Sequence, residues 1–265
     1  MQEIRLIATD IDGTLVKDSA PSIYPEMIDL IKKLTDKGYI FFVASGRAYH
    51  SIKAMFSEVS DRIGYIAENG AHIIYQGKDL LVKNMNREYV EGIFWDIQQY
   101  TDTCDYVVST TEGSLMDTKN EEFIKLIRDG YRNKFRMTED ILGEKEPIIK
   151  MALFCKGSIR KLAERDIIPK WQDKVKCCMA GEEWVDFMDK SVDKGNALKF
   201  IQEYLNIPKE ATMAFGDNNN DVGLISQAGE SYAVENAVDE VKKAAKHICP
   251  SYNDRGVYKV LNQLV

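Results

Sequence analysis

The sequence predicts an α/β fold built on a doubly wound parallel sheet, with a smaller α+β unit inserted into it. Residues 4–9 and 39–44 are nearly continuous apolar runs, which are typical of strands buried on both faces of a parallel sheet. A helix is predicted between them, and short apolar runs alternate with helical stretches again near the C-terminus. The chain of 265 residues exceeds the usual length of one domain, so we expect one core with a sizeable insertion.

The first predicted helix connects the two apolar runs. Ile28, Ile31 and Leu34 repeat at helical spacing, while Pro25 suits a first helical turn. Gly38 stands where the end of a helix favours a residue in the left-handed conformation. The order strand, helix, strand predicts a right-handed crossover, which makes the two strands parallel members of one sheet.

The end of the chain repeats this order. Its three short apolar runs, separated by helical stretches, are residues 212–215, 231–234 and 247–249. Because alternating strands and helices at both ends suit one doubly wound sheet, we expect residues 1–82 and 190–265 to form a single core.

The middle of the chain, residues 83–189, follows a different pattern. Long amphipathic helices are predicted at residues 86–101 and 120–128. The runs that look like antiparallel strands are residues 150–155, 175–179 and 184–188. We therefore expect this segment to fold as an α+β insertion with its own layer.

The composition is that of a globular chain, with 45% hydrophobic and 29% charged residues. The 35 Lys and Arg residues are outnumbered by 42 Asp and Glu residues, which gives a net charge of −7. This sign disfavours a nucleic-acid partner. The most basic stretch, residues 125–136, is interleaved with acidic residues and is typical of a solvated surface. No obligate protein partner is evident from the sequence.

The apolar runs and the cysteines predict location and redox state. The N-terminal apolar run is too short for a signal peptide, and no stretch approaches the roughly 18 apolar residues of a membrane helix. The five Cys residues are scattered without CxxC spacing, so neither a disulfide framework nor a zinc site is expected. We expect a soluble cytoplasmic protein that does not associate with membranes and keeps its thiols reduced.

Two carboxylates follow the first predicted strand. Asp10 and Asp12 lie in the segment Asp-Ile-Asp-Gly-Thr, residues 10–14. Open α/β sheets bind ligands at the carboxyl ends of their strands, which is where this segment is expected. Asp and Gly are also common in turns and helix caps, so the segment alone does not decide between a turn and a site.

Three further polar segments are expected at the same edge of the sheet. Ser45-Gly46-Arg47 follows the second strand, and residues 216–221, Gly-Asp-Asn-Asn-Asn-Asp, follow a later strand. Lys194 opens a helix; by itself it is typical of a solvated lysine, but a cation is disfavoured at a helix N-terminus, which hints at a nearby anion. Together the segments offer carboxylates for an oxygen-seeking cation, and a hydroxyl, a lysine and helix-start amides for a phosphoryl group. They predict a phosphoryl-transfer site.

These four segments, in this order, resemble the four motifs of the haloacid dehalogenase (HAD) superfamily, and most closely its Cof-like phosphatase family. The strings at residues 68–71, Glu-Asn-Gly-Ala, and 235–242 also resemble that family. Asn218 stands where Ser is usual, and Glu235 where Gly is usual in a turn near the site; neither change removes a catalytic group. The resemblance is strong in residues 1–82 and 190–265, which flank the insertion. Within the insertion, residues 83–189, only the architecture resembles that family.

The resemblance implies a Rossmann-like HAD core with residues 83–189 as a cap that sets substrate specificity. It also implies a Mg²⁺-dependent phosphatase in which Asp10 attacks phosphorus and forms an aspartyl-phosphate. Asp12 would protonate the leaving oxygen and later take a proton from water, a role for which it should ionise less readily than a free Asp. The substrate would be a small phosphorylated metabolite, such as a sugar phosphate or a phosphorylated cofactor.

The resemblance further implies a role for each polar residue. Mg²⁺ would be held by the Asp10 carboxylate, the Asp12 backbone carbonyl and Asp217, with Asp221 behind them. Arg47 either reaches the substrate or pairs with a neighbouring residue. The phosphoryl oxygens would be bound by the Ile11 and Gly46 amides, Ser45, Lys194 and Asn220.

Three alternative functions share parts of this site. A dehalogenase would use Asp10 alone without a metal, whereas Asp12 and Asp217 are present here. A sugar phosphomutase has the same aspartyl-phosphate chemistry and differs in whether water or a sugar hydroxyl accepts the phosphoryl group. A phospho-receiver-like signalling module also phosphorylates an Asp, but it lacks a large insertion and an acid/base residue such as Asp12.

Two segments of the insertion are candidates for contacting a substrate. They are residues 110–114 and the strand region that contains Cys177, Cys178 and Trp184. Their residue types are more typical of a turn and of packed core.

Overall fold

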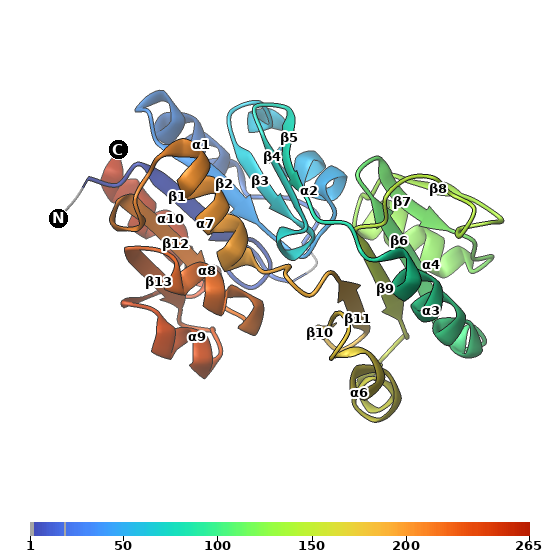
Figure 1. Cartoon of the computed structure of the whole chain (residues 1–265). Coiled ribbons are helices and arrows are strands. Elements are labelled where there is room, and N and C mark those ends of the chain that lie inside the picture. Colours follow the sequence, from blue (N-terminus) through green and yellow to red (C-terminus); the bar gives the residue numbers. More distant parts are fainter. Residues whose placement is uncertain (1–2, 19) are drawn as a thin grey trace. The chain divides into compact units, whose positions relative to one another are not determined.

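The computed structural model describes residues 3–18 and 20–265, which form both helices and strands (Figure 1). The chain divides into two compact units. The first unit comprises Met1–Leu81 and Asp193–Val265, and the second unit is Val82–Val192. The α/β fold class predicted from the sequence, with a sheet rich in parallel strands, is confirmed.

A sheet of eight strands, counted over the described residues, forms the centre of the first unit. Its order is β14-β13-β12-β1-β2-β3-β4-β5. Neighbours from β14 to β3 are parallel, and β4 is antiparallel to β3. The strands are β1 (Leu6–Asp10), β2 (Ile40–Ala44), β3 (Gly64–Ala67), β4 (His72–Tyr75), β5 (Lys78–Val82), β12 (Thr212–Gly216), β13 (Glu230–Val234) and β14 (His247–Cys249).

The order of this sheet reverses between β1 and β12, which lie side by side (Figure 1). From β1 the chain adds β2 and β3 on one side, whereas β12, β13 and β14 follow on the other side. In doubly wound sheets, ligands bind at the carboxyl ends of the two strands at such a reversal. Asp10 is the last residue of β1, and Asp217 directly follows β12.

The helices of the first unit connect these strands. Helix α1 begins at Pro25 and buries Ile28, Ile31 and Leu34 in the apolar core, as their spacing predicts. Gly38 follows its end with a φ of +92°, a conformation that favours glycine. The helices are α1 (Pro25–Asp36), α2 (Tyr49–Met55), α7 (Lys194–Leu205), α8 (Val222–Ser226), α9 (Asp239–Ala244) and α10 (Gly256–Leu261).

The second unit has its own sheet, in which six strands are described in the order β10-β11-β9-β6-β7-β8. Neighbours are antiparallel except for β7 and β8. The three strands expected from the sequence are present, together with β6, β7 and β8, for which no strand was predicted. The strands are β6 (Asp105–Thr110), β7 (Gly113–Met116), β8 (Phe135–Met137), β9 (Lys150–Phe154), β10 (Lys176–Ala180) and β11 (Trp184–Met188).

Two helices of the second unit, α3 and α4, begin with side-chain caps. Asn86 accepts a hydrogen bond from the Glu88 amide at the start of α3, and Asn120 accepts from the Glu122 and Phe123 amides at the start of α4. These helices are shorter than the predicted ranges because short 3₁₀ and π turns complete them. The α-helices are α3 (Arg87–Ile97), α4 (Glu121–Lys125), α5 (Arg160–Leu162) and α6 (Ile168–Trp171).

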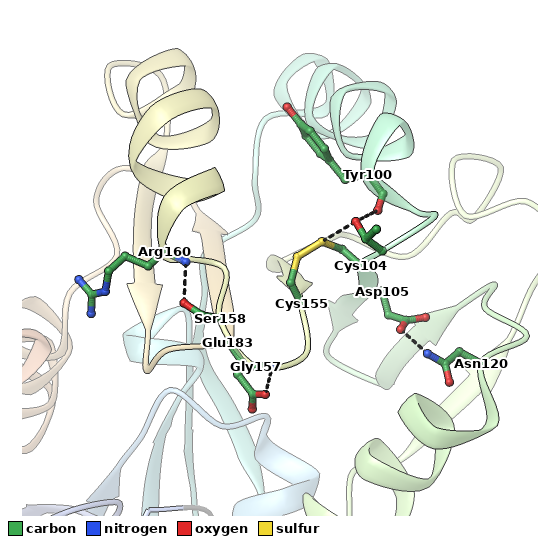
Figure 2. The surroundings of a disulfide bond; sticks show 10 residues. Tyr100, Cys104, Asp105, Asn120, Cys155, Gly157, Ser158, Arg160 and Glu183 are labelled. Atoms are coloured by element: carbon green, nitrogen blue, oxygen red, sulfur yellow. Dashed lines mark hydrogen bonds between the residues drawn. A yellow bond between two sulfur atoms is a disulfide. The ribbon is translucent and has the colours of Figure 1, made fainter.

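A disulfide joins Cys104 to Cys155 in the second unit, and its surroundings are drawn in Figure 2. The expectation that no disulfide forms and that all thiols are reduced is therefore wrong. Strands β6 and β9 pair with Asp105 opposite Phe154, so the two cysteines lie one step further along the same register. Their Cα atoms are 4.4 Å apart. The spacing of cysteines in the sequence does not show that β6 and β9 pair in this register. The disulfide could therefore not be predicted from the sequence.

The described ranges contain three further cysteines, all free: Cys177, Cys178 and Cys249. Within the same ranges, none of the helices combines the length and the hydropathy that crossing a bilayer requires.

Candidate active site

Three carboxylates meet at the reversal point of the first unit's sheet. Asp10 ends β1, Asp217 follows β12, and Asp221 ends a 3₁₀ turn, Asn219–Asp221, that leads into α8. Each offers one oxygen, and these three oxygens lie within 4.8 Å of one another. The structure thus brings together three of the four residues that the sequence predicts for a metal site.

Lys194 lies inside this acidic cluster. It is the first residue of α7 and only 1% exposed. Its Nζ donates to Asp10 Oδ1 at 2.6 Å and to Asp221 Oδ1 at 2.7 Å. Asp193 caps the same helix by accepting from the Gly195 amide. Lys194 is therefore not a solvated lysine. Its position at a helix start suggests a nearby anion, and the structure places the carboxylates of Asp10 and Asp221 there.

Burial and charge shift the acid–base properties of the cluster. Burial, together with the charge of Asp221, raises the pKa of Asp10 well above its ordinary value, against the opposing effect of Lys194. The same two causes raise the pKa of Asp217 to about 6. Burial alone would lower the pKa of Lys194, but Asp10 and Asp221 outweigh burial and raise it. Three carboxylates against one ammonium leave an excess of negative charge.

The cluster fits a divalent cation. The Oδ2 atom of Asp10 is buried and, among the described residues, accepts no hydrogen bond. Buried carboxylate oxygens normally have a partner, and carboxylate oxygens are the ligands that Mg²⁺ prefers. Asp221 is bound differently: its Oδ2 accepts from the Asp217 and Asn218 amides while its Oδ1 accepts from Lys194. Asp221 thus holds the loop after β12 in place.

The turn after β1 brings Asp217 close. Gly13 has a φ of +83°, and a Cβ atom at this position would collide with the Asp217 carboxylate, so only glycine suits the position. The Thr14 hydroxyl donates to Asp217 Oδ1 at 2.7 Å. The sequence alone assigns no role to Thr14, although its place in the segment 10–14 is a signal.

Asp12 forms an ion pair with Arg47. Nε and Nη2 of Arg47 lie 2.8 and 2.5 Å from the two Asp12 carboxylate oxygens. Nη2 also donates to the Ala20 carbonyl at 3.0 Å. The sequence leaves two roles open for Arg47: contact with the substrate, or pairing with a neighbouring residue. In the structure Arg47 pairs with Asp12. Both carboxylate oxygens of Asp12 accept hydrogen bonds from Arg47. Asp12 can therefore donate a proton only after its ion pair with Arg47 has separated.

The residues predicted to bind phosphate lie in four segments of the chain, and Asn69 contacts two of these segments. Ser45, at the end of β2, is 2% exposed, and its backbone carbonyl accepts from the Asn69 amide at 2.9 Å. A Cβ atom on Gly46 would lie 3.2 Å from the Asn69 side chain. Asn220 donates to Asn69 Oδ1 at 2.9 Å. Ile11 is fully buried directly after β1. Asn69 belongs to the family string at residues 68–71, but the sequence alone assigns it no role.

The C-terminal segment also supports the two central loops. The Asn236 side chain donates to the Gly13 carbonyl at 2.7 Å, and the Val238 amide donates to the Asp217 carbonyl at 2.9 Å. Glu235 is exposed, and its amide donates to the Cys249 carbonyl. Glu235 therefore does not belong to the acidic cluster. Asn236 supports the loop beside the cluster, although the sequence alone assigns it no role.

Known proteins are similar to this chain over nearly its whole length. A family model described as haloacid dehalogenase-like hydrolase matches residues 7–261. The 5-amino-6-(5-phospho-D-ribitylamino)uracil phosphatase YbjI of Escherichia coli is 25% identical over 99% of this chain and 96% of its own length. The phosphatase YwtE of Bacillus subtilis, which has the same descriptive name, is 26% identical over 99% of this chain and 98% of its own.

Solved structures resemble the whole chain as well. A crystal structure from Eubacterium rectale superposes with a TM-score of 0.87 and 35% sequence identity, over 99% of both chains. The similarity extends over both units, because a match of this coverage includes the insertion.

Proposed function

Because the chain belongs to the haloacid dehalogenase-like hydrolases and is a phosphatase of that superfamily, we propose that it hydrolyses small phosphorylated metabolites with Mg²⁺. The observation that carries this proposal is the buried contact of Lys194 with Asp10, in a cluster that also contains Asp217. A fold alone would not suffice, since one fold supports many activities. The cluster offers a nucleophile, a cation site and a positive charge for phosphate.

Asp10 is the proposed nucleophile. One of its oxygens is held by Lys194, and the other is buried without a hydrogen bond from the described residues. An Asp10 oxygen would form a bond to phosphorus while the bond to the leaving oxygen breaks, which gives an aspartyl-phosphate. Water would then attack this phosphorus, release inorganic phosphate and regenerate the Asp10 carboxylate.

Asp12 is the proposed general acid and base. It would give a proton to the leaving oxygen in the first step and take one from the attacking water in the second. Its bidentate pairing with Arg47 orients the carboxyl group, and release of that pair would accompany proton transfer. Arg47 would thus position Asp12.

Mg²⁺ would be held by the Asp10 carboxylate, the Asp12 backbone carbonyl and Asp217, with Asp221 behind them. When bound, the ion supplies positive charge that offsets repulsion between the Asp10 carboxylate and a phosphate dianion. The Ile11 and Gly46 amides, Ser45, Lys194 and Asn220 would bind the phosphoryl oxygens.

The second unit, Val82–Val192, is proposed to act as a cap that recognises the organic part of the substrate. The similar E. coli and B. subtilis phosphatases are named for a substrate with a phosphorylated ribityl group. We therefore propose sugar phosphates or phosphorylated cofactors as the substrate class. A sugar phosphomutase is the second candidate, because the aspartyl-phosphate chemistry of Asp10 would serve both. A phospho-receiver-like signalling module is a more distant one.

The first experiment measures release of p-nitrophenol from p-nitrophenyl phosphate with and without Mg²⁺. Asp10→Asn should lose at least about 1,000-fold in kcat, and Asp12→Asn about 100-fold or more. Asp29→Asn removes an exposed carboxylate from α1 and serves as the matched control with unchanged kcat.

Each outcome separates the candidates. Full turnover by Asp10→Asn would exclude the covalent mechanism. Isomerisation of a sugar phosphate primed by a bisphosphate, without phosphate release, would identify a mutase. Labelling of Asp10 by acetyl phosphate that lasts minutes, without turnover, would identify a signalling module.

A further inference from the structure

Three consecutive residues of the first unit have a left-handed backbone. The φ angles are +49° at Glu68, +57° at Asn69 and +104° at Gly70. Glycine adopts this conformation without steric cost, whereas two other residues in succession make a strained segment. Such strain persists where the surrounding structure holds it, and it is concentrated at functional sites. We call residues 68–70 the left-handed turn. It directly follows β3 and contains none of the residues predicted to bind phosphate or metal.

Backbone hydrogen bonds join the left-handed turn to the segment after β2. The Glu68 amide donates to the Arg47 carbonyl at 3.0 Å, and the Asn69 amide donates to the Ser45 carbonyl at 2.9 Å. The left-handed turn is buried, and Asn69 is only 5% exposed. Buried backbone groups need partners, and here the partners belong to a loop that is proposed to bind phosphate. The left-handed turn therefore supports that loop.

The left-handed turn also contacts two other segments of the site. Asn220, on the 3₁₀ turn that leads into α8, donates from its Nδ2 atom to Asn69 Oδ1 at 2.9 Å. A Cβ atom on Gly70 would lie 2.7 Å from the Asp193 carbonyl oxygen, so the left-handed turn packs closely against the start of α7. Lys194 is the first residue of that helix. Three of the four segments predicted to bind phosphate therefore meet the left-handed turn.

The hydrogen bond to Asn69 fixes the orientation of the Asn220 amide. A side-chain amide has two N–H donors at one end and a carbonyl acceptor at the other. Because Asn69 accepts one of the two N–H groups, the Asn220 amide cannot turn over without losing this bond. A phosphoryl oxygen is an acceptor and requires a donor. Asn69 therefore selects the orientation in which Asn220 can donate its second N–H group.

We propose that Asn69 is a positioning residue whose side chain orients Asn220 for binding of the phosphoryl group. This inference rests on the proposed phosphatase function. Asn69 acts through Asn220, and the left-handed turn holds Asn69 in the place that this role requires. Asparagine meets both demands, because it tolerates the left-handed conformation better than most residues and carries a side-chain oxygen that accepts a hydrogen bond.

The test measures inhibition of p-nitrophenyl phosphate hydrolysis by inorganic phosphate, in the full chain with Mg²⁺. Asn69→Gly removes the side chain and relieves the strain at this position, so the variant should fold. Its inhibition constant for phosphate should rise at least about tenfold, and kcat/KM should fall by a similar factor, because a hydrogen bond to a charged group is weakened.

Asn206→Gly is the matched control. Asn206 is also a left-handed asparagine of the first unit, with a φ of +50°, and it is exposed at the end of α7. The change from Asn to Gly is therefore the same in chemistry and in backbone conformation. The inhibition constant of Asn206→Gly should equal that of the parent.

Asn69→Ala separates positioning from stability. It removes the same amide group but is strained at a positive φ, so its Tm should lie about 2–4 °C below that of Asn69→Gly. Both variants should nevertheless raise the inhibition constant by the same factor. A rise in Asn69→Ala that is absent from Asn69→Gly would follow stability alone and would overturn the proposal.

A double-variant cycle tests whether Asn69 acts through Asn220. Asn220→Ala alone should raise the inhibition constant at least about tenfold. Adding Asn69→Gly to Asn220→Ala should then change the constant less than about threefold, because the partner is already absent. Multiplicative effects of the two changes, or an unchanged constant in Asn69→Gly, overturn the proposal. Absence of Mg²⁺-dependent p-nitrophenyl phosphate hydrolysis in the parent would instead contradict the phosphatase function itself.

Discussion

Lys194 shares one buried ammonium group between the carboxylates of Asp10 and Asp221. The two acids derive from segments more than 200 residues apart in the chain, and the lysine neutralises part of their mutual repulsion. Removing one partner of a buried ionic group typically costs about 3–5 kcal/mol, because the remaining charge stays buried and uncompensated. Lys194 therefore contributes to folding as well as to the proposed chemistry.

We expect Lys194→Met to lower the free energy of unfolding of the metal-free protein by about 3 kcal/mol or more. Urea unfolding followed by circular dichroism measures this change. Lys199→Met alters an exposed lysine of the same helix and should stay within about 0.5 kcal/mol of the parent. Equal stability of Lys194→Met and the parent would show that the buried contacts of Lys194 do not stabilise the fold.

The Asp217 carboxyl group links stability to pH. Its pKa is raised from 3.8 to about 6 by burial and by the charge of Asp221, whereas the unfolded chain keeps the ordinary value. Between these two values the folded protein holds a proton that the unfolded chain has lost. Stability of the metal-free protein therefore falls as the pH rises through this window, and the penalty is complete above pH 6.

The variant Asp217→Asn removes this penalty and keeps an oxygen that can accept from Thr14. In the absence of metal it should be more stable than the parent at pH 7.5, by up to about 3 kcal/mol, and the difference should vanish below about pH 4. Mg²⁺ should raise the Tm of the parent more at pH 7.5 than at pH 5, because a protonated carboxyl binds metal poorly. Differential scanning calorimetry over this range measures both effects. A Mg²⁺ shift of the same size in Asp217→Asn would exclude Asp217 as a ligand.

The central acids of this cluster could be predicted from the sequence, whereas the residues that support them could not. Asp10 and Asp217 directly follow apolar runs, and strand ends are where α/β sheets place ligands. Thr14, Asn69 and Asn236 make their contacts through partners 203, 151 and 223 residues away. No local pattern contains such pairings, because they depend on which strands become neighbours.

At the scale of strands, the first unit was easier to predict than the second. Strands β1 and β2 are buried over almost their whole length and read as continuous apolar runs. Strand β6 ends in Ser109 and Thr110, which are polar yet buried, so its pattern is weaker. The pairing of β6 with β9, which also aligns Cys104 with Cys155, could not be read from the sequence.

The disulfide should stabilise the second unit by closing a loop between residues 51 apart in sequence. For a loop of this length the chain-entropy estimate is about 4 kcal/mol. We expect dithiothreitol to lower the Tm of the parent protein, as followed by circular dichroism. The variant Cys104→Ser/Cys155→Ser should have the same Tm with and without the reductant. Titration of five free thiols in the unfolded, non-reduced parent would contradict the disulfide.

At the scale of the whole molecule, each unit has an apolar core of its own. The clusters that fill the second unit consist of its own residues, and the acidic cluster consists of residues of the first unit alone. The acids and Lys194 do not require the second unit for their mutual contacts. We therefore expect the proposed metal binding to be separable from the proposed recognition of the organic group.

Replacing Val82–Val192 with a flexible Gly/Ser linker tests this separation. The shortened protein should still unfold cooperatively, and Mg²⁺ should still raise its Tm. Asp217→Asn in the same shortened protein is the control and should abolish the Mg²⁺ effect. A shortened protein that folds but shows no response to Mg²⁺ would contradict a metal site formed by the first unit alone.

The pairing of β1 with β12 has a consequence for synthesis of the protein on the ribosome. Leu6 of β1 lies opposite Thr212 of β12, and the Thr14 hydroxyl reaches Asp217 across 203 residues. The Asn236 side chain donates to the Gly13 carbonyl, which lies 223 residues earlier in the chain. A nascent chain can complete these contacts only after the segment that contains Asn236 has left the exit tunnel. Until then Asp10 lacks contacts with partners that lie about 200 residues later in the chain, so the proposed metal site can form only late in synthesis.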